Sequence, residues 1–233
     1  MAFLIQRGLT ALIVAALAAA PVQAEVIAQY NFTGQPGNQA SQAVATTAPG
    51  VTAGDIIRGP GLVPNAGATS INSNSWTLGG TIANAITNND YYSFTINFGS
   101  TVFNLTTLDY NQQVSSTGPS TINLLTSIGG FVDTAVVASF ASTSGPISVN
   151  LSSLTGVTGT VEFRLYGFGA TNTAGTYRLG QPANPLFTLN GDRVPQNGSD
   201  AIPEPSTLVL AGVIGLGVAV RLRNRNRLDH NAA

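Results

Sequence analysis

Strict alternation of apolar and polar side chains is the feature of this chain that most restricts its fold. In residues 91–98 (YYSFTINF) every second side chain is apolar, and residues 160–168 (TVEFRLYGF) repeat this pattern. Successive side chains of a β-strand point to opposite faces, so both segments are predicted to be strands with one buried face. The apolar sets are Tyr92, Phe94, Ile96 and Phe98 in the first segment and Val161, Phe163 and Leu165 in the second.

Further segments rich in β-branched and aromatic residues follow one another, separated by Gly, Pro, Asn and Ser. They predict an all-β fold of about eight to ten strands. We expect a jelly-roll-like antiparallel β-sandwich, because two packed sheets are a common way to protect strand edges. Residues 33–80 are predicted to be long loops with one or two short strands, and no helix is expected between residues 25 and 205. The predicted strands are residues 26–32, 91–98, 101–111, 120–128, 134–140, 146–151, 160–168 and 185–191.

The first 24 residues have the order of a secretory signal peptide. Arg7 supplies a positive start, residues 9–20 are apolar, and a small-residue cleavage site ends at Ala24. This pattern predicts a signal helix that signal peptidase removes, so that the mature chain begins at Glu25.

The charge of the chain is low and unevenly placed. All nine basic residues are arginines, only 8% of residues are charged, and there is no cysteine. An exported chain of this kind has no disulfide and depends on burial and sheet hydrogen bonds. Residues 25–205 hold four arginines against nine carboxylates, which argues against nucleic acid as a partner.

An apolar run near the C-terminus is followed by a cluster of arginines. The run covers residues 207–220, and a helix of this length spans about 21 Å against a hydrocarbon core of about 30 Å. Arginine side chains extend the reach of such a helix to the headgroups and mark the cytoplasmic side. We therefore expect a short transmembrane helix that leaves the β domain outside. The clustered arginines are Arg221, Arg223, Arg225 and Arg227.

Pro203, Glu204 and Pro205, followed by the apolar run and the arginines, resemble the PEP-CTERM sorting signal of Gram-negative bacteria. The resemblance implies export, a transient inner-membrane intermediate, processing near Pro-Glu-Pro by an exosortase, and delivery to the cell surface or the medium. It also implies a link to exopolysaccharide and biofilm, so extracellular polysaccharide is a candidate partner. The expected divisions are a signal peptide (1–24), a β-sandwich domain (25–192), a linker (193–202), the sorting signal (203–227) and a tail (228–233).

Three short motifs within the domain resemble a β-sandwich module that is common in PEP-CTERM proteins. They lie at residues 116–119, 127–131 and 162–170. This second resemblance bears on the fold and implies no particular activity.

The side chains that nucleophilic catalysis needs are missing from the predicted domain. The single histidine, His230, lies in the tail, and there is no cysteine. Ser-His-Asp and Cys-His catalysis and zinc sites built on His or Cys are therefore excluded for residues 25–205. A glycosidase, the third alternative, needs a facing pair of carboxylates, whereas the carboxylates here are scattered singly. We expect no enzyme and assign no catalytic residue.

Asn88, Asn89 and Asp90 are the candidate metal ligands. They offer side-chain oxygens next to backbone carbonyls, the ligand set that calcium takes. The same residues also suit an ordinary turn before a strand. Calcium is thus left open, and no other cofactor is expected.

Two functions remain after these exclusions. The first is a structural or adhesive role in an extracellular polysaccharide matrix. The second is a carbohydrate-binding module that recognises a defined glycan through aromatic rings. Tyr166 alternates with the core set and is the expected exposed ring, whereas Trp76 is expected in the core more than at a sugar-binding face.

Overall fold

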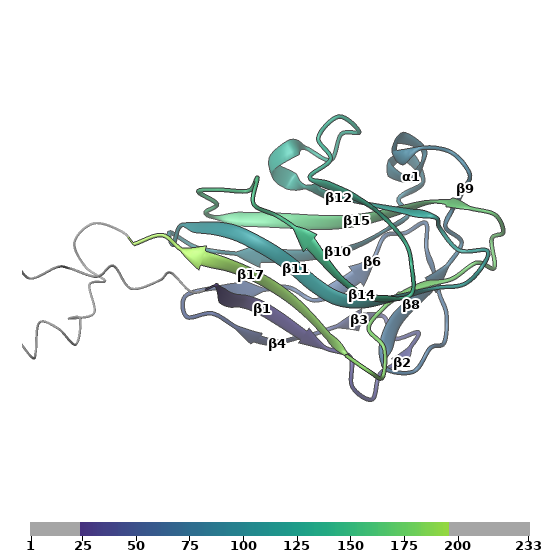
Figure 1. Cartoon of the computed structure of the whole chain (residues 1–233), viewed down its shortest axis with the longest axis horizontal. Coiled ribbons are helices and arrows are strands. Elements are labelled where there is room, and N and C mark those ends of the chain that lie inside the picture. Colours follow the sequence, from purple (N-terminus) through teal and green to yellow (C-terminus); the bar gives the residue numbers. More distant parts are fainter. Residues whose placement is uncertain (1–23, 196–233) are drawn as a thin grey trace, which may run out of the picture.

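Two β-sheets packed face to face form the body of the protein (Figure 1). The computed structural model describes residues 24–195. The predicted signal helix, the sorting signal with its short transmembrane helix, and the tail therefore lie outside the described residues. Neither helix within residues 24–195 has the length and apolar character that crossing a membrane requires.

The larger sheet has nine strands, in the path order β2-β8-β16-β11-β17-β1-β4, with β14 on β11 and β7 on β8. All of its pairings are antiparallel except β2 with β8. Its strands are β1 (Glu25–Asn31), β2 (Pro36–Gly37), β4 (Val44–Thr47), β7 (Val63–Pro64), β8 (Ser70–Asn74), β11 (Phe103–Val114), β14 (Gly145–Asn150), β16 (Tyr177–Leu179) and β17 (Leu186–Arg193).

The smaller sheet has eight strands, in the path order β13-β12-β15-β10-β6-β3, with β5 on β10 and β9 on β15. Only the β9–β15 pairing is parallel. Its strands are β3 (Ser41–Gln42), β5 (Thr52–Ala53), β6 (Ile56–Arg58), β9 (Thr77–Leu78), β10 (Tyr91–Asn97), β12 (Thr121–Thr126), β13 (Ala138–Ala141) and β15 (Thr160–Ala170).

The apolar core lies between the two sheets. It confirms the prediction that the alternating apolar side chains of each strand are buried on one face. Phe94 of β10 stacks on Phe163 of β15 with ring centroids 5.0 Å apart, and both rings are buried. Phe187 of β17 meets Phe94 edge-on from the facing sheet, at 5.1 Å. Burial of such aromatic and aliphatic side chains is the main favourable term in folding this cysteine-free chain.

A second, smaller apolar cluster lies on the outer face of the smaller sheet. There α1 (Ile82–Asn88) and the loop that carries a 3-10 turn, η1 (Ser127–Gly129), cover part of β15 and β12 (Figure 1). Ala85 of α1 packs with Leu125 and Tyr166, all three fully buried. The face opposite the main core is therefore only partly open to water.

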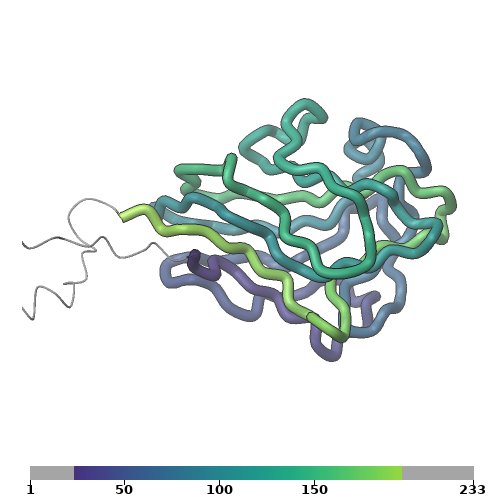
Figure 2. The backbone as a smooth tube through the Cα atoms, viewed as in Figure 1, coloured from purple at the N-terminus to yellow at the C-terminus, as the bar shows by residue number. Residues whose placement is uncertain are grey.

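Both ends of the described chain lie at the same end of the domain (Figure 2). β1 and β17 pair antiparallel, with Glu25 opposite Gly191. β17 is also paired with β11, so it is held by a neighbour on each side.

The fold departs from expectation in three respects. The described residues contain seventeen strands, because residues 33–80 form several two- to five-residue strands where long loops are predicted. β16, which completes the sheet next to β11, is not among the predicted strands. The helix α1 is also missed, since seven residues are too few for a clear helical period.

Candidate functional site

Tyr166, the ring expected at the surface, is buried with 1% of its area exposed. Its position on the outer face of β15 is as predicted, but α1 covers that face. Its ring meets Tyr91 edge-on at 5.0 Å and packs against Ala85 and Leu125. The prediction of an exposed ring at Tyr166 is therefore wrong, because the seven-residue helix α1, which side-chain alternation does not report, covers that face.

Arg164 organises the outer face beside Tyr166. Its Nε lies 2.7 Å from Oε1 of Glu162, which is two residues away on the same face of β15. Its guanidinium lies over the rings of Phe131 (3.9 Å) and Tyr91 (4.5 Å) and donates to the Tyr166 hydroxyl. Burial lowers the pKa of Arg164, but the hydrogen bonds with Glu162 and Tyr166 outweigh it and raise the pKa. The cation is fully partnered, so this cluster is structural.

Trp76 is also buried, with 1% of its area exposed. Its Nε1 donates to the Ser73 carbonyl at 3.0 Å, and its ring meets Tyr92 and Tyr177 edge-on at 5.4 and 5.6 Å. Its assignment to the core is confirmed. As a candidate glycan contact it is wrong, since no ring face is open for a sugar to stack on.

Trp76, Asn88 and Asp90 nevertheless line one open pocket of about 530 Å³. We call it the Asp90 pocket; Gly61, Thr77 and Asn84 also line it. Three of the residues singled out from the sequence thus come together. Asn89 does not line the pocket: it adopts a left-handed conformation (φ 61°) that ends α1.

A short hydrogen-bond chain fixes the floor of the Asp90 pocket. Thr77 Oγ1 donates to Asp90 Oδ2 at 2.6 Å and accepts from Asn88 Nδ2 at 3.1 Å. Thr77 is in β9, Asp90 immediately precedes β10, and Asn88 is the last residue of α1. The chain therefore ties these three elements together and leaves the Asn88 amide oxygen pointing away from Thr77.

Asp90 is the buried charge of this pocket, with 3% of its area exposed. Burial raises the pKa of its carboxyl, and the hydrogen bonds from Thr77 oppose that rise. Neither ion pair among residues 24–195 involves it: these join Arg164 to Glu162 and Arg193 to Glu25.

Gly61 closes one wall of the pocket by direct backbone contact. A Cβ at this position would lie 2.0 Å from Asp90 Oδ1 and 2.2 Å from the Asn88 carbonyl oxygen. Only glycine fits such a close approach. Both oxygens therefore pack against the backbone of Gly61 on the same side.

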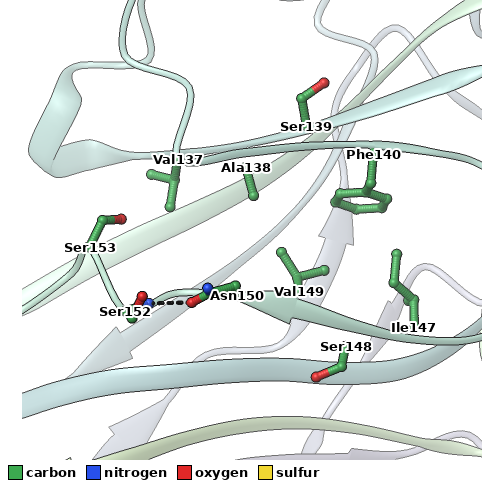
Figure 3. A pocket seen from close by; sticks show the side chains of 10 residues that line it. All are labelled: Val137, Ala138, Ser139, Phe140, Ile147, Ser148, Val149, Asn150, Ser152 and Ser153. Atoms are coloured by element: carbon green, nitrogen blue, oxygen red, sulfur yellow. Dashed lines mark hydrogen bonds between the residues drawn. The ribbon is translucent and has the colours of Figure 1, made fainter.

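A second cavity, of about 430 Å³, opens at one edge of the sandwich, between β13 and β14. We call it the edge groove. Val137, Ala138 and Phe140 point toward Val149 and Ile147 across it, whereas Ser139 and Ser148 point away (Figure 3). Each of the two strands pairs with one neighbouring strand among the described residues, β12 and β11 respectively, so the groove lies between two free strand edges.

The edge groove has an apolar interior and a polar end. Asn150 and Ser152 are joined there by a 2.9 Å hydrogen bond from the Ser152 N–H to Asn150 Oδ1 (Figure 3). None of its lining residues is charged. Phe140, half-buried, is the one aromatic ring that it offers. Such a surface suits an uncharged ligand with both apolar and hydroxyl faces.

Comparison with known proteins bears on the C-terminal segment. Residues 201–225 match the PEP-CTERM protein-sorting motif, which confirms the resemblance seen in the sequence. The chain therefore carries a sorting motif of exosortase substrates, and this motif implies export through a membrane-held intermediate.

Comparison with solved structures bears on the β-sandwich. A carbohydrate-binding module, CBM36 in complex with calcium and xylotriose, is 19% identical over 59% of this chain and 87% of that chain, with a TM-score of 0.30. A TM-score this low gives the likeness no weight for function. No curated protein matches the chain.

Proposed function

We propose that this protein is an exported, exosortase-sorted β-sandwich with a structural or adhesive role in an extracellular polysaccharide matrix. The observation that carries the proposal is the sorting motif at residues 201–225, which follows a folded β-sheet domain in the sequence. The described residues hold no group of three or more His, Cys, Asp or Glu side chains able to bind a metal ion.

The surface chemistry of the domain supports the same role. Hydroxyl and amide side chains, rather than ion pairs, make it hydrophilic, and only 8% of the whole chain is charged. Contacts made through hydroxyls and amides are weakly affected by salt, whereas exposed ion pairs are screened. Such a surface suits association with neutral polysaccharide.

The proposal also includes the processing sites, the domain boundaries and the processing partners that were expected from the sequence. They are cleavage after Ala24, a jelly-roll-like domain over residues 25–192, a linker over residues 193–202 and a short transmembrane helix before the arginines. Signal peptidase and an exosortase are the processing partners, and the inner membrane is a transient location.

The sorting step is tested by the intact mass and C-terminal peptides of protein recovered from the native cell surface or medium. We expect a C-terminus near residues 203–206, because the exosortase is expected to act near Pro-Glu-Pro. A recovered chain still ending at Ala233 would contradict release and would point to a permanent membrane anchor. Deleting Arg221 to Arg227 is the matched control and should prevent processing.

Recognition of a defined glycan is the second candidate function, and the edge groove favours it. The groove is uncharged, and one aromatic ring, Phe140, lies inside it. A glycosidase would need two facing carboxylates. The edge groove has none, and the Asp90 pocket has only Asp90.

Filling the groove tests this second function. We expect Ala138→Phe to reduce binding to a neutral polysaccharide at least about tenfold, which corresponds to about 1.4 kcal/mol. The reason is steric, since Ala138 faces Val149 across the opening (Figure 3). Binding is measured by affinity electrophoresis of the exported protein, with Ser139→Phe, which points away from the groove, as control. Equal loss in both variants would rule out the groove as the glycan site.

A further inference from the structure

Asp90 is a buried carboxylate whose ionised form has no cationic partner among the described side chains. It is 97% removed from water, and its hydrogen-bond partner is Thr77. Burying an anion is costly unless a cation or several donors compensate it. An aspartate of the larger sheet shows the contrast: the half-buried Asp109 accepts from both Thr107 (2.9 Å) and Asn190 (2.7 Å).

Other oxygens gather around this carboxylate. Asp90 Oδ1 and the Asn88 carbonyl oxygen both lie within 2.2 Å of the point that a Cβ on Gly61 would occupy. The Asn88 side chain lines the same pocket; its Nδ2 donates to Thr77 Oγ1, and no described residue donates to its amide oxygen. The set combines a carboxylate, a main-chain carbonyl and an amide oxygen, with neither nitrogen nor sulfur ligands.

The end of α1 adds to the negative potential at this place. The helix ends at Asn88, whose carbonyl accepts no hydrogen bond from another described residue, whereas the carbonyls of Ala85, Ile86 and Thr87 are bonded; a free carbonyl at a helix C-terminus favours a cation. The lining contains neither lysine nor arginine that could occupy the position of a bound cation. The site is open to solvent on its other side, as a bound ion that keeps several waters requires.

We propose that the Asp90 pocket binds a calcium ion through the Asp90 carboxylate, the Asn88 main-chain carbonyl and the Asn88 amide oxygen. Calcium accepts this mixture of hard oxygen ligands in irregular geometry and completes its shell with water. One carboxylate provides little charge, so the affinity belongs to the millimolar range of extracellular modules. Asn89 is not a ligand, because its backbone turns it out of the pocket.

Thermal unfolding of the exported protein in EDTA and in 10 mM calcium chloride tests the site. We expect calcium to raise the Tm by about 3–6 °C, because an ion that binds only the folded state stabilises it by mass action. Asp90→Asn should abolish this shift. The same variant should raise the Tm in EDTA by a few degrees, because it removes an unpaired buried charge but keeps an acceptor for Thr77.

The Tm of Asp90→Asn in EDTA and its Tm in calcium chloride together distinguish an ion-binding role of Asp90 from a purely structural one. A residue that only holds the fold together would lower the Tm when replaced. Asp109→Asn is the matched control, and it should lower the Tm in EDTA while leaving the calcium shift intact. Asn88→Ala is an independent variant if Asp90→Asn fails to fold; it should at least halve the calcium shift.

Three results would overturn the proposal: no calcium shift in the wild-type protein, an equal shift in Asp90→Asn, or an equal rise with magnesium chloride. A Tm that responds to a neutral monosaccharide but not to calcium would reassign the pocket to sugar hydroxyls. The measurement needs only the folded protein. It is thus independent of whether sorting or matrix attachment proves correct.

Discussion

Replacing Trp76 with alanine is expected to lower the free energy of unfolding by about 4–5 kcal/mol. The indole is the largest buried side chain of the domain, and it fills the space between two buried tyrosines at 5.4 and 5.6 Å. Its removal leaves a cavity that the surrounding strands cannot close, because Gly167 opposite it has no side chain. The Ser73 carbonyl also loses its donor from the indole. Urea unfolding of the exported protein measures the effect.

Two companion variants make the test specific. Trp76→Phe keeps an aromatic ring and should cost about half as much. Gly167→Ala should also destabilise, since its Cβ would lie 2.5 Å from Trp76 Cε3. Leu78→Ala, at a side chain that is 53% exposed, is the control and should change stability by less than about 0.5 kcal/mol. A loss below about 2 kcal/mol for Trp76→Ala would contradict its place in the core.

Replacing Arg58 with methionine is expected to cost about 2–4 kcal/mol, although Arg58 has no carboxylate partner among the described residues. Arg58 is in β6 of the smaller sheet, and its guanidinium donates to four groups elsewhere in the fold. Its partners are the carbonyls of Gly37 (2.6 Å), Gln39 and Asn72 (2.8 Å) and the hydroxyl of Ser73 (2.8 Å). Gly37, Asn72 and Ser73 belong to the larger sheet, so this one side chain joins the two sheets at their edge.

The expected loss of stability in Arg58→Met arises mainly because the four acceptors of the Arg58 guanidinium are left without that donor. Burial lowers the pKa of Arg58, with the nearby Tyr92 opposing that shift. Methionine removes the buried charge but leaves the carbonyls without donors, which is the larger cost. Arg58→Lys should lower the free energy of unfolding by less than Arg58→Met does. The lysine ammonium keeps a donor and the charge, but it cannot reach all four acceptors.

Arg178→Met is the matched control for this prediction. Arg178 is half-buried, its side chain makes no hydrogen bond or ion pair with another described residue, and burial lowers its pKa. We expect a change below about 1 kcal/mol, measured by the same urea unfolding. Equal losses at Arg58 and Arg178 would show that the sheet-to-sheet hydrogen bonds add nothing.

Side-chain alternation predicted the β-sandwich because it reports directly which face of a strand is buried. β10 and β15 begin at the expected residues, and Phe94 and Phe163 meet in the core. Alternation cannot report what covers the opposite face. Tyr166 therefore lies on the correct face of β15 and is still buried, under a helix of seven residues.

The signal for that helix was present but short. Ile82, Ala85 and Ile86 recur at helical spacing, and Thr81 with Asn84 forms the capping box at its start. The Asp90 pocket could be predicted only in part, because Asn88 and Asp90 are neighbours in sequence but Gly61 and Thr77 come from distant loops and strands. The edge groove could not be predicted at all, since it depends on which strands end each sheet.

The placement of β17 decides how the domain would respond to a pulling force. β17 is the last described strand, and it lies between β1 and β11, hydrogen-bonded to both. A tension applied at its C-terminal end runs along the strand, so the bonds of both ladders are loaded together in shear rather than broken one after another. An attachment made through the C-terminal segment would therefore act on the mechanically most resistant direction of the sheet.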